Sequence, residues 1–173
     1  VTDNGKGVAG VAPDAKIQPV RVLAKCGGSL SDISDAIVWA SGGYVPGVPT
    51  NSNPADTINM SLGGGGACGS TYQAAIDTAV SRGTSVIVAA GNESQNASNV
   101  RPANCSNVVV VAASNPSGGP SFYTNYGSAI DVTAPGGDTR YAGQGVLSTI
   151  NTGSTTPSRE GYASSQGTSM ATP

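Results

Sequence analysis

Two short, uninterrupted runs of apolar residues constrain the fold of this chain more than any other feature. Ser85 to Ala90 reads S-V-I-V-A-A, and Asn107 to Ala113 reads N-V-V-V-V-A-A. Runs that are rich in β-branched residues and lack polar alternation are typical of strands buried on both faces of a parallel sheet. We therefore expect a sheet with a packed layer on each face.

Weaker segments predict further strands and loops. Strands are expected at Lys16 to Ala24, at Thr57 to Ser61 and at Ala129 to Val132. The segments Gly42 to Pro54 and Gly153 to Gly161 are rich in Gly, Pro, Asn and Ser, which predicts surface loops.

Two helices are predicted between the strands from apolar residues at helical spacing. The first follows Ser29, its expected N-cap, and carries an apolar stripe that includes Ile37. The second begins with a capping box made by Ser70 and Gln73 and ends at Gly83. Alternating strands and helices indicate right-handed βαβ units, so the fold class is α/β.

Charge and hydropathy exclude several classes of protein. Charged residues make up 10% of the chain, against about 25% on average, and the net charge is −2. This balance does not fit a basic nucleic-acid-binding surface. No apolar run approaches the roughly 18 residues of a membrane span, and no signal peptide is recognised at the start. Scarce charge with abundant small polar residues is typical of a compact, loop-rich extracellular protein.

Histidine is absent from the 173 residues, which excludes a Ser-His-Asp triad, a Cys-His dyad and a histidine metal site within them. The three cysteines, Cys26, Cys68 and Cys105, form no C-x-x-C pair, so neither a zinc nor a thioredoxin motif is present. In a secreted chain an odd count leaves one cysteine free or paired outside these residues. Three reduced core cysteines in a cytosolic protein are the alternative.

Two glycine-rich segments resemble nucleotide-binding motifs but lack their context. Gly5 to Gly10 matches G-x-G-x-x-G, yet only four residues precede it and Pro13 interrupts any following helix. Gly63 to Gly66 is a run of four glycines that is not followed by G-K-[ST]. This run predicts a flexible turn or a place where another backbone approaches closely.

The last seven residues, Gly167 to Pro173, read G-T-S-M-A-T-P. A Gly-Thr-Ser step of this kind can simply be a loop that enters a helix with serine as its cap. It is also a favourable place for a nucleophile, because the amides at a helix N-terminus stabilise negative charge nearby.

With this motif the chain resembles the subtilases, the subtilisin-like serine proteases, and most of all those that Gram-negative bacteria secrete. Further matching segments follow in family order along essentially the whole chain: Gly7–Pro13 with Val20–Leu23, Ile58–Gly64, Val86–Glu93, Tyr126–Gly127 and Asp131–Gly136. The resemblance implies a three-layer α/β fold with a mostly parallel central sheet, incomplete at both ends.

The resemblance also implies roles for single residues. Ser169 is the expected acyl-accepting nucleophile, and the Asn92 side-chain amide and the Ser169 N–H are the expected oxyanion donors. Ser61, Leu62 and Gly63 are expected to form one wall of the substrate cleft and to pair with an extended peptide. Gly27, Gly28 and Leu30 are expected to form the opposing strand. Ala89, Ala90 and Gly91 are expected to line a roomy pocket that favours bulky hydrophobic side chains.

Subtilases need a catalytic aspartate and a catalytic histidine, each within its own sequence motif. Neither motif is found in this chain, and both would lie upstream of Val1. We therefore expect residues 1–173 to be the central part of one peptidase catalytic domain, inactive alone, from a secreted, monomeric serine endopeptidase. Its partners would be protein or peptide substrates, without nucleic acid or membrane. Catalysis needs no cofactor, but carbonyls of Ala103, Cys105 and Val108 match a structural calcium site of the family.

Two other functions and one disulfide bond are also considered. A non-peptidase α/β hydrolase would require G-x-S-x-G around the nucleophile, which this chain lacks. A catalytically inactive subtilase-like binding or structural protein would show a substituted histidine upstream. The family strand order places Cys26 and Cys68 in neighbouring Gly-rich loops, which predicts a disulfide between them and leaves Cys105 free or paired elsewhere.

Overall fold

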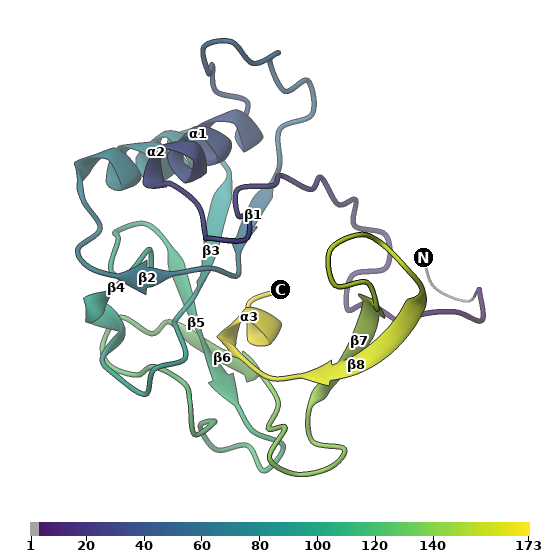
Figure 1. The fold of residues 1–173 in the computed structure, drawn as a ribbon. Helices are drawn as coiled ribbons and strands as arrows, with labels where there is room; N and C mark the ends of the chain where they lie inside the picture. The colour runs from purple at the N-terminus through teal and green to yellow at the C-terminus, as the bar shows by residue number, and fades with distance from the viewer. Residues whose placement is uncertain (1–3) are drawn as a thin grey trace.

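A four-stranded parallel sheet forms the centre of the computed structural model, which describes residues 4–173 (Figure 1). The strands lie in the order β1-β3-β5-β6. Their bounds are β1 Thr57–Met60, β3 Ser85–Ala89, β5 Val109–Ser114 and β6 Val132–Pro135. Because all four run parallel, their carboxyl ends meet at one edge, where ligands of open α/β sheets bind.

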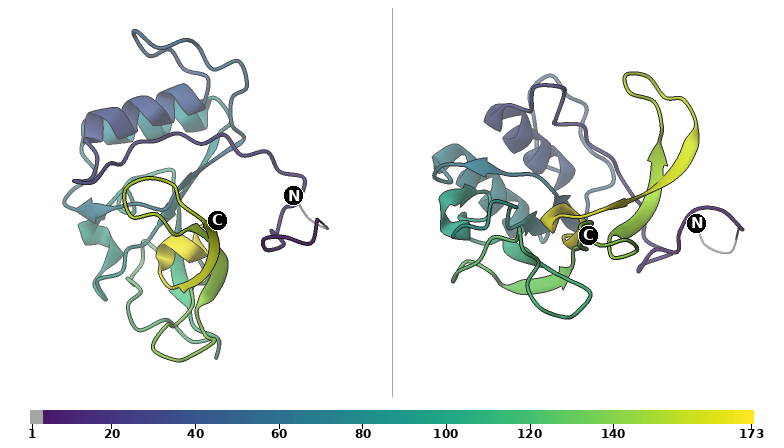
Figure 2. Two further views of the ribbon diagram at one scale, coloured as in Figure 1. Left: turned by 45° about the vertical axis from the view of Figure 1, so that its right-hand side comes forward. Right: turned by 60° about the horizontal axis from the view of Figure 1, so that its bottom comes forward.

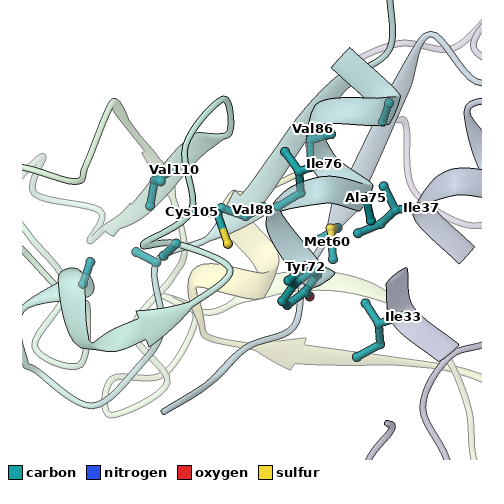
Figure 3. Close-up of a cluster of buried hydrophobic side chains, with 14 of the residues drawn as sticks. Ile33, Ile37, Met60, Tyr72, Ala75, Ile76, Val86, Val88, Cys105 and Val110 are labelled. Carbon is teal, nitrogen blue, oxygen red and sulfur yellow. The ribbon is translucent and has the colours of Figure 1, made fainter. Parts of the chain in front are cut away.

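One face of the sheet is covered by two helices, α1 (Leu30–Ala40) and α2 (Ser70–Ser81), which lie side by side (Figure 1). Figure 3 shows their apolar side chains packed against the strands. The buried residues that share this cluster include Ile33, Ile37, Tyr72, Ile76, Val86 and Val88. Burial of this apolar surface is the main stabilising contribution to the fold.

The opposite face packs against the short helix α3 (Thr168–Ala171). Along β5 the side chains alternate: Val110 and Ala112 join the α1–α2 cluster, whereas Val111 and Ala113 pack with Ala171. Since β5 is buried on both faces, its uninterrupted apolar run is explained. The predicted three-layer α/β architecture is confirmed.

Two small antiparallel elements lie outside this sheet, and neither was expected. Strands β7 (Val146–Asn151) and β8 (Glu160–Ser165) form a hairpin that stands beside the sheet and leads into α3 (Figure 2). Strand β2 (Gly64–Gly65) pairs with β4 (Val100–Arg101), which follows the 3-10 turn η1 (Ala97–Asn99). Within residues 4–173, none of the helices has the length and apolarity needed to cross a membrane.

The helix boundaries confirm two sequence signals and correct one. Ser29 caps α1, because its side chain accepts a hydrogen bond from the Asp32 N–H at 3.0 Å. The predicted capping box of α2 is wrong, since Gly69 occupies the N-cap and Ser70 is the first helical residue. Gly83 follows the C-cap of α2 with φ 89° and ends the helix as expected.

The prediction of a strand at Lys16 to Ala24 is wrong. Among the described residues this segment pairs with no other strand, and its one bridge, between Ala24 and Gly27, closes the turn before α1. A hollow of about 370 Å³ lies between residues 16–22 and β1. Without a paired neighbour, β-branched residues alone do not make a strand. The last sheet strand begins at Val132, at the end of the segment expected from Ala129 to Val132.

The predicted disulfide between Cys26 and Cys68 is also wrong. Cys68 is bonded to Cys105, with a Cα–Cα distance of 5.2 Å, and Cys26 is a free, exposed cysteine. The pairing of β2 with β4 brings the loop that carries Cys68 beside the loop that carries Cys105. Cys26 instead lies in the turn before α1, outside this small ladder.

Candidate active site

Ser169 lies in the first turn of α3, directly after Gly167 and Thr168 and beyond the carboxyl end of β1. Its Oγ donates a hydrogen bond to the Ser61 carbonyl at 3.2 Å, and the Ser61 Oγ donates to the Ser169 carbonyl at 3.0 Å. This reciprocal pair joins two segments that are 108 positions apart. The half-buried Ser169 side chain is thereby placed at the carboxyl edge of the sheet.

Asn92 lies next to residues 167–169, the turn that carries the expected nucleophile Ser169 and is called the nucleophile turn below, as the sequence motifs predict. Its Oδ1 accepts hydrogen bonds from the Thr168 backbone N–H at 2.8 Å and from the Thr168 Oγ1 at 3.0 Å. Within residues 4–173 the Nδ2 amide has no hydrogen-bond partner. Because the oxygen end of the side chain is held, the amide end of this exposed residue remains available to donate to a ligand.

The turn that carries Asn92 follows β3 and spans residues 90–95. Gly91 has φ 101°, and a Cβ at this position would collide with the Asn125 side-chain amide, so a glycine is required. The Gly91 N–H donates to the Thr168 Oγ1 at 3.2 Å. Thr168 therefore holds both the backbone of this turn and the side chain of Asn92.

Asn125 lies beneath this turn and is fully buried. Its Nδ2 donates to the Ala90 carbonyl and to Glu93 Oε2, both at 2.8 Å. Its Oδ1 accepts from the N–H groups of Glu93 at 3.1 Å and Gln95 at 3.0 Å. All the donors and acceptors of the amide side chain are used on a single turn.

Tyr123 holds the nucleophile turn from the other side. Its buried hydroxyl accepts a hydrogen bond from the Gly167 N–H at 3.0 Å and lies 2.8 Å from the Gly136 carbonyl and 3.0 Å from the Gly137 carbonyl, to which it donates. The hydroxyl joins the loop after β6 to the residue that precedes Thr168. The nucleophile turn is thus anchored at both of its ends.

An ion pair lies on the segment that adjoins this loop. Asp138 and Arg140 are joined at 2.6 Å, and the Arg140 guanidinium lies 3.7 Å above the Phe122 ring. Hydrogen bonds from Arg140 lower the pKa of the Asp138 carboxyl, which keeps it ionised. Between them, Thr139 donates from its N–H and Oγ1 to Gln166 Oε1, at 2.7 and 2.8 Å, and so connects this segment to the nucleophile turn.

The expected substrate-binding residues fall into two groups. Six of them lie at or directly after the carboxyl ends of β1 and β3: Ser61, Leu62 and Gly63 follow β1, Ala89 is the last residue of β3, and Ala90 and Gly91 follow it. The other three are exposed: Gly27 and Gly28 lie in the turn that leads into α1, and Leu30 is the first residue of α1. No hydrogen bond within residues 4–173 joins this second group to Ser169, and Gly27 and Gly28 line a separate hollow of about 460 Å³.

Thr168, Tyr123 and Asn125 were not identified from the sequence. Thr168 has a usable signal, since it stands directly before Ser169, the expected nucleophile. Asn125 and Tyr123 belong to a short polar segment after β5 in which nothing distinguishes them from neighbouring loop residues. The described part of the chain also contains no cluster of three or more His, Cys, Asp or Glu side chains that could hold a metal ion.

The chain matches the model of one protein family over residues 1–173, and the description of that family is the subtilase family, Peptidase_S8. It is 60% identical over 173 residues to an extracellular protease of Xanthomonas campestris, covering 29% of that protein. It is 49% identical over the same length to an extracellular basic protease of Dichelobacter nodosus, covering 28% of it. The chain therefore spans less than two thirds of the length of these relatives.

Solved structures are also similar to this chain in fold and in sequence. Proteases from Pseudoalteromonas arctica share 61% sequence identity with this chain at a TM-score of 0.96. The match covers 99% of this chain and 51% of that structure. A subtilisin-like proteinase described as cold adapted matches at a TM-score of 0.66 and 31% identity, over 88% of this chain and 47% of its own.

Proposed function

The chain belongs to the subtilase family, and from this premise we propose that residues 1–173 supply the nucleophile and the oxyanion donors of a serine endopeptidase. Ser169 is the proposed nucleophile. The Asn92 Nδ2 amide and the Ser169 backbone N–H are the proposed donors. The observation that carries the proposal is the pair of hydrogen bonds from Thr168 to Asn92 Oδ1, because they leave the Nδ2 amide free beside the nucleophile turn.

In the proposed reaction, the Ser169 Oγ attacks the carbonyl carbon of the scissile peptide bond while a histidine accepts the hydroxyl proton. Negative charge develops on the carbonyl oxygen, where the two donors stabilise it. The C–N bond then breaks as the histidine returns the proton to the leaving amine. Water hydrolyses the resulting Ser169 ester by the same steps in reverse order.

The histidine and its aspartate partner are proposed to come from a part of the polypeptide upstream of these residues. Two observations support this. The 173 residues contain no histidine, and the Ser169 Oγ donates to the Ser61 carbonyl, an acceptor that cannot remove its proton. Residues 1–173 are then the central part of one peptidase catalytic domain, and the working enzyme is longer than this chain.

The proposed substrate is a protein or peptide that lies extended across the carboxyl edge of the sheet. Ser61, Leu62 and Gly63 would pair with its backbone as an added strand. Ala89, Ala90 and Gly91 would form the side of the pocket for the residue before the cut, with small side chains that favour a bulky hydrophobic residue there. Gly27, Gly28 and Leu30 would provide the opposing strand.

We propose that the enzyme is secreted. The Xanthomonas and Dichelobacter relatives are both named extracellular proteases. The Cys68–Cys105 disulfide is consistent with an oxidising compartment outside the cytosol.

A structural calcium ion is also proposed, in a cavity of about 740 Å³ between the disulfide and β5. Ala103, Cys105 and Val108 line it, together with the Asp131 carboxylate and Asn104, whose buried Oδ1 has no hydrogen-bond partner among the described residues. Calcium takes six to eight such hard oxygen ligands. Calcium should raise the unfolding temperature relative to a chelator, and Asp131→Asn should reduce that difference.

The proposed function is tested by single substitutions in the full-length protease. Ser169→Ala should abolish hydrolysis of a peptide with a bulky hydrophobic residue before the cut. Asn92→Ala should lower kcat about 10²–10³-fold with little change in KM, a range that was measured on subtilisin itself. Asn53→Ala, at an exposed loop asparagine, is the control and should leave both constants unchanged. Hydrolysis that persists in Ser169→Ala would overturn the proposal.

A further inference from the structure

We propose that Asn125 is the positioning residue of the oxyanion-donor turn. From its buried place between β5 and β6, it holds residues 90–95 in the conformation that presents Asn92 to the substrate carbonyl. This inference rests on the proposed function, and it adds a residue that neither touches the substrate nor belongs to the nucleophile motif.

The hydrogen-bonding capacity of the Asn125 side chain is fully used. The residue is fully buried, and its side chain makes four hydrogen bonds of 2.8–3.1 Å, all to residues 90–95. Its backbone N–H adds a fifth, to the Gly91 carbonyl at 3.1 Å. A buried amide with unpaired polar atoms would destabilise the fold, so this geometry specifies one conformation of the turn.

Residues 90–95 have no regular secondary structure of their own. Gly91 has φ 101° and Ser94 has φ 51°, so two of these residues are in left-handed conformations, one of them not a glycine. The N–H groups of Glu93 and Gln95 both donate to Asn125 Oδ1 rather than to carbonyls within the turn. The turn is therefore shaped by a side chain that lies 30 to 35 positions away in the sequence.

Two hydrogen bonds to Glu93 connect Asn125 to Asn92. Asn125 Nδ2 donates to Glu93 Oε2 at 2.8 Å, and the same oxygen accepts the Asn92 N–H at 3.0 Å. Asn92 is thus held through its backbone by Glu93 and through its Oδ1 by Thr168. Loss of the Asn125 amide would free the backbone contact and allow the Nδ2 donor to move.

The chain offers a matched control for this role. Asn51 is also buried and also makes four side-chain hydrogen bonds: to Gln18 through both its oxygen and its nitrogen, to the Ala40 carbonyl and from the Asn53 N–H. It lies in the loop after α1, and none of its side-chain hydrogen bonds reaches α3 or residues 90–95. The same Asn→Asp change at the two positions therefore separates a general effect on folding from an effect on the site.

The experiment measures kcat and KM for four forms of the full-length protease, normalised to the folded fraction from circular dichroism. These are wild type, Asn125→Asp, Asn92→Ala and the double variant. Asn125→Asp replaces a donor with an acceptor that faces the Ala90 carbonyl and Glu93. We expect it to lower kcat about 10- to 100-fold with KM changed less than about threefold, as for a misplaced transition-state group.

The decisive comparison is made in the Asn92→Ala background, where Asn125→Asp should lower kcat by less than about threefold because its effect passes through Asn92. Asn51→Asp should shift the unfolding midpoint without changing kcat of the folded enzyme. An equal loss of kcat in both backgrounds would overturn the inference, as would an unchanged kcat. If Asn125→Asp does not fold, Glu93→Ala removes the hydrogen bonds that connect Asn125 to Asn92. Its effect on kcat is then compared in the wild-type and Asn92→Ala backgrounds, as a double-mutant cycle, in the same way.

The two proposals fail in different ways. If wild type shows no hydrolysis that depends on Ser169, the proposed function is wrong and the role of Asn125 is lost with it. If hydrolysis depends on Ser169 and on Asn92 but the cycle is additive, the proposed function stands and only the inference about Asn125 is overturned.

Discussion

The Cys68–Cys105 disulfide should be a large contributor to the stability of this fold. The perturbation is the double substitution Cys68→Ala and Cys105→Ala in the full-length protein, made in a Ser169→Ala background because the proposed peptidase activity would otherwise digest the sample. Cys26→Ala in the same background is the control, because Cys26 is exposed and free. The two cysteines that form the bond are separated by 37 positions.

The expected loss follows from the length of the closed loop. In the chain-entropy model, a bond that closes a loop of 37 residues lowers the free energy of folding by about 4 kcal/mol at room temperature. Cys105 is buried, so removal of its sulfur leaves a small cavity that costs about 1 kcal/mol more. The double variant should therefore lose about 4–5 kcal/mol of unfolding free energy.

Urea unfolding followed by circular dichroism measures the loss directly. The slope of the unfolding free energy against urea concentration, the m-value, should also rise, since an unfolded chain without the cross-link exposes more surface. The control should stay within about 0.5 kcal/mol of its parent, as expected for an exposed side chain. A loss below about 1 kcal/mol in the double variant, or an equal loss in the control, would refute the reasoning.

Three further predictions concern the core, a buried phenol and the chain on its own. Ile76→Ala should lower the unfolding free energy by about 3–4 kcal/mol, because Ile76 is fully buried in the α1–α2 cluster. Val80→Ala, on the exposed side of the same helix, should have little effect. Comparable losses of unfolding free energy for the two variants in urea melts would contradict this. Burial raises the pKa of Tyr72 from 10.0 to about 12, and its hydroxyl has no partner among the described residues. The unfolded chain therefore loses the Tyr72 proton first as the pH rises, so this residue contributes a loss of stability between about pH 10 and 12. Tyr72→Phe should remove that contribution and leave stability at neutral pH equal or higher, and a clear loss at neutral pH would show that the hydroxyl is hydrogen-bonded. The 173-residue chain made alone should not hydrolyse the peptide substrate, because it contains no histidine; turnover that depends on Ser169 would reveal a general base within these residues.

The parts of the fold that the sequence predicts are those in which burial leaves a pattern. Strands β3 and β5 are recognisable because both of their faces are covered, so apolar residues follow one another without interruption. The β7–β8 hairpin leaves no such pattern, since most residues of β7 are exposed and its sequence does not alternate cleanly. The segment Lys16 to Ala24 shows the converse error: its composition suits a strand, but its neighbours decide whether it becomes one.

The site is predictable to the same limited degree. The proximity of Asn92 to the nucleophile turn follows from motifs that each occupy consecutive residues. The disulfide does not, because three cysteines allow three pairings, and the correct one depends on the pairing of two glycines in β2 with Val100 and Arg101. The role of Asn125 cannot be predicted from the sequence either, since it depends on burial and hydrogen bonds, and these leave no pattern around a loop asparagine.

The contact between Thr168 and Asn92 has a consequence for the order in which the molecule folds. It joins residues 76 positions apart, so a large loop must close before the two hydrogen bonds can form. The Thr168 N–H is bonded to a side chain in the turn after β3 rather than within α3, so it is released whenever that contact opens. Native-state hydrogen exchange should therefore find the Thr168 amide opening at a lower free energy than the amides of β3 and β5. The proposed nucleophile Ser169 would then be positioned after the sheet during folding, and in the full-length protein its reactivity would report completion of the fold.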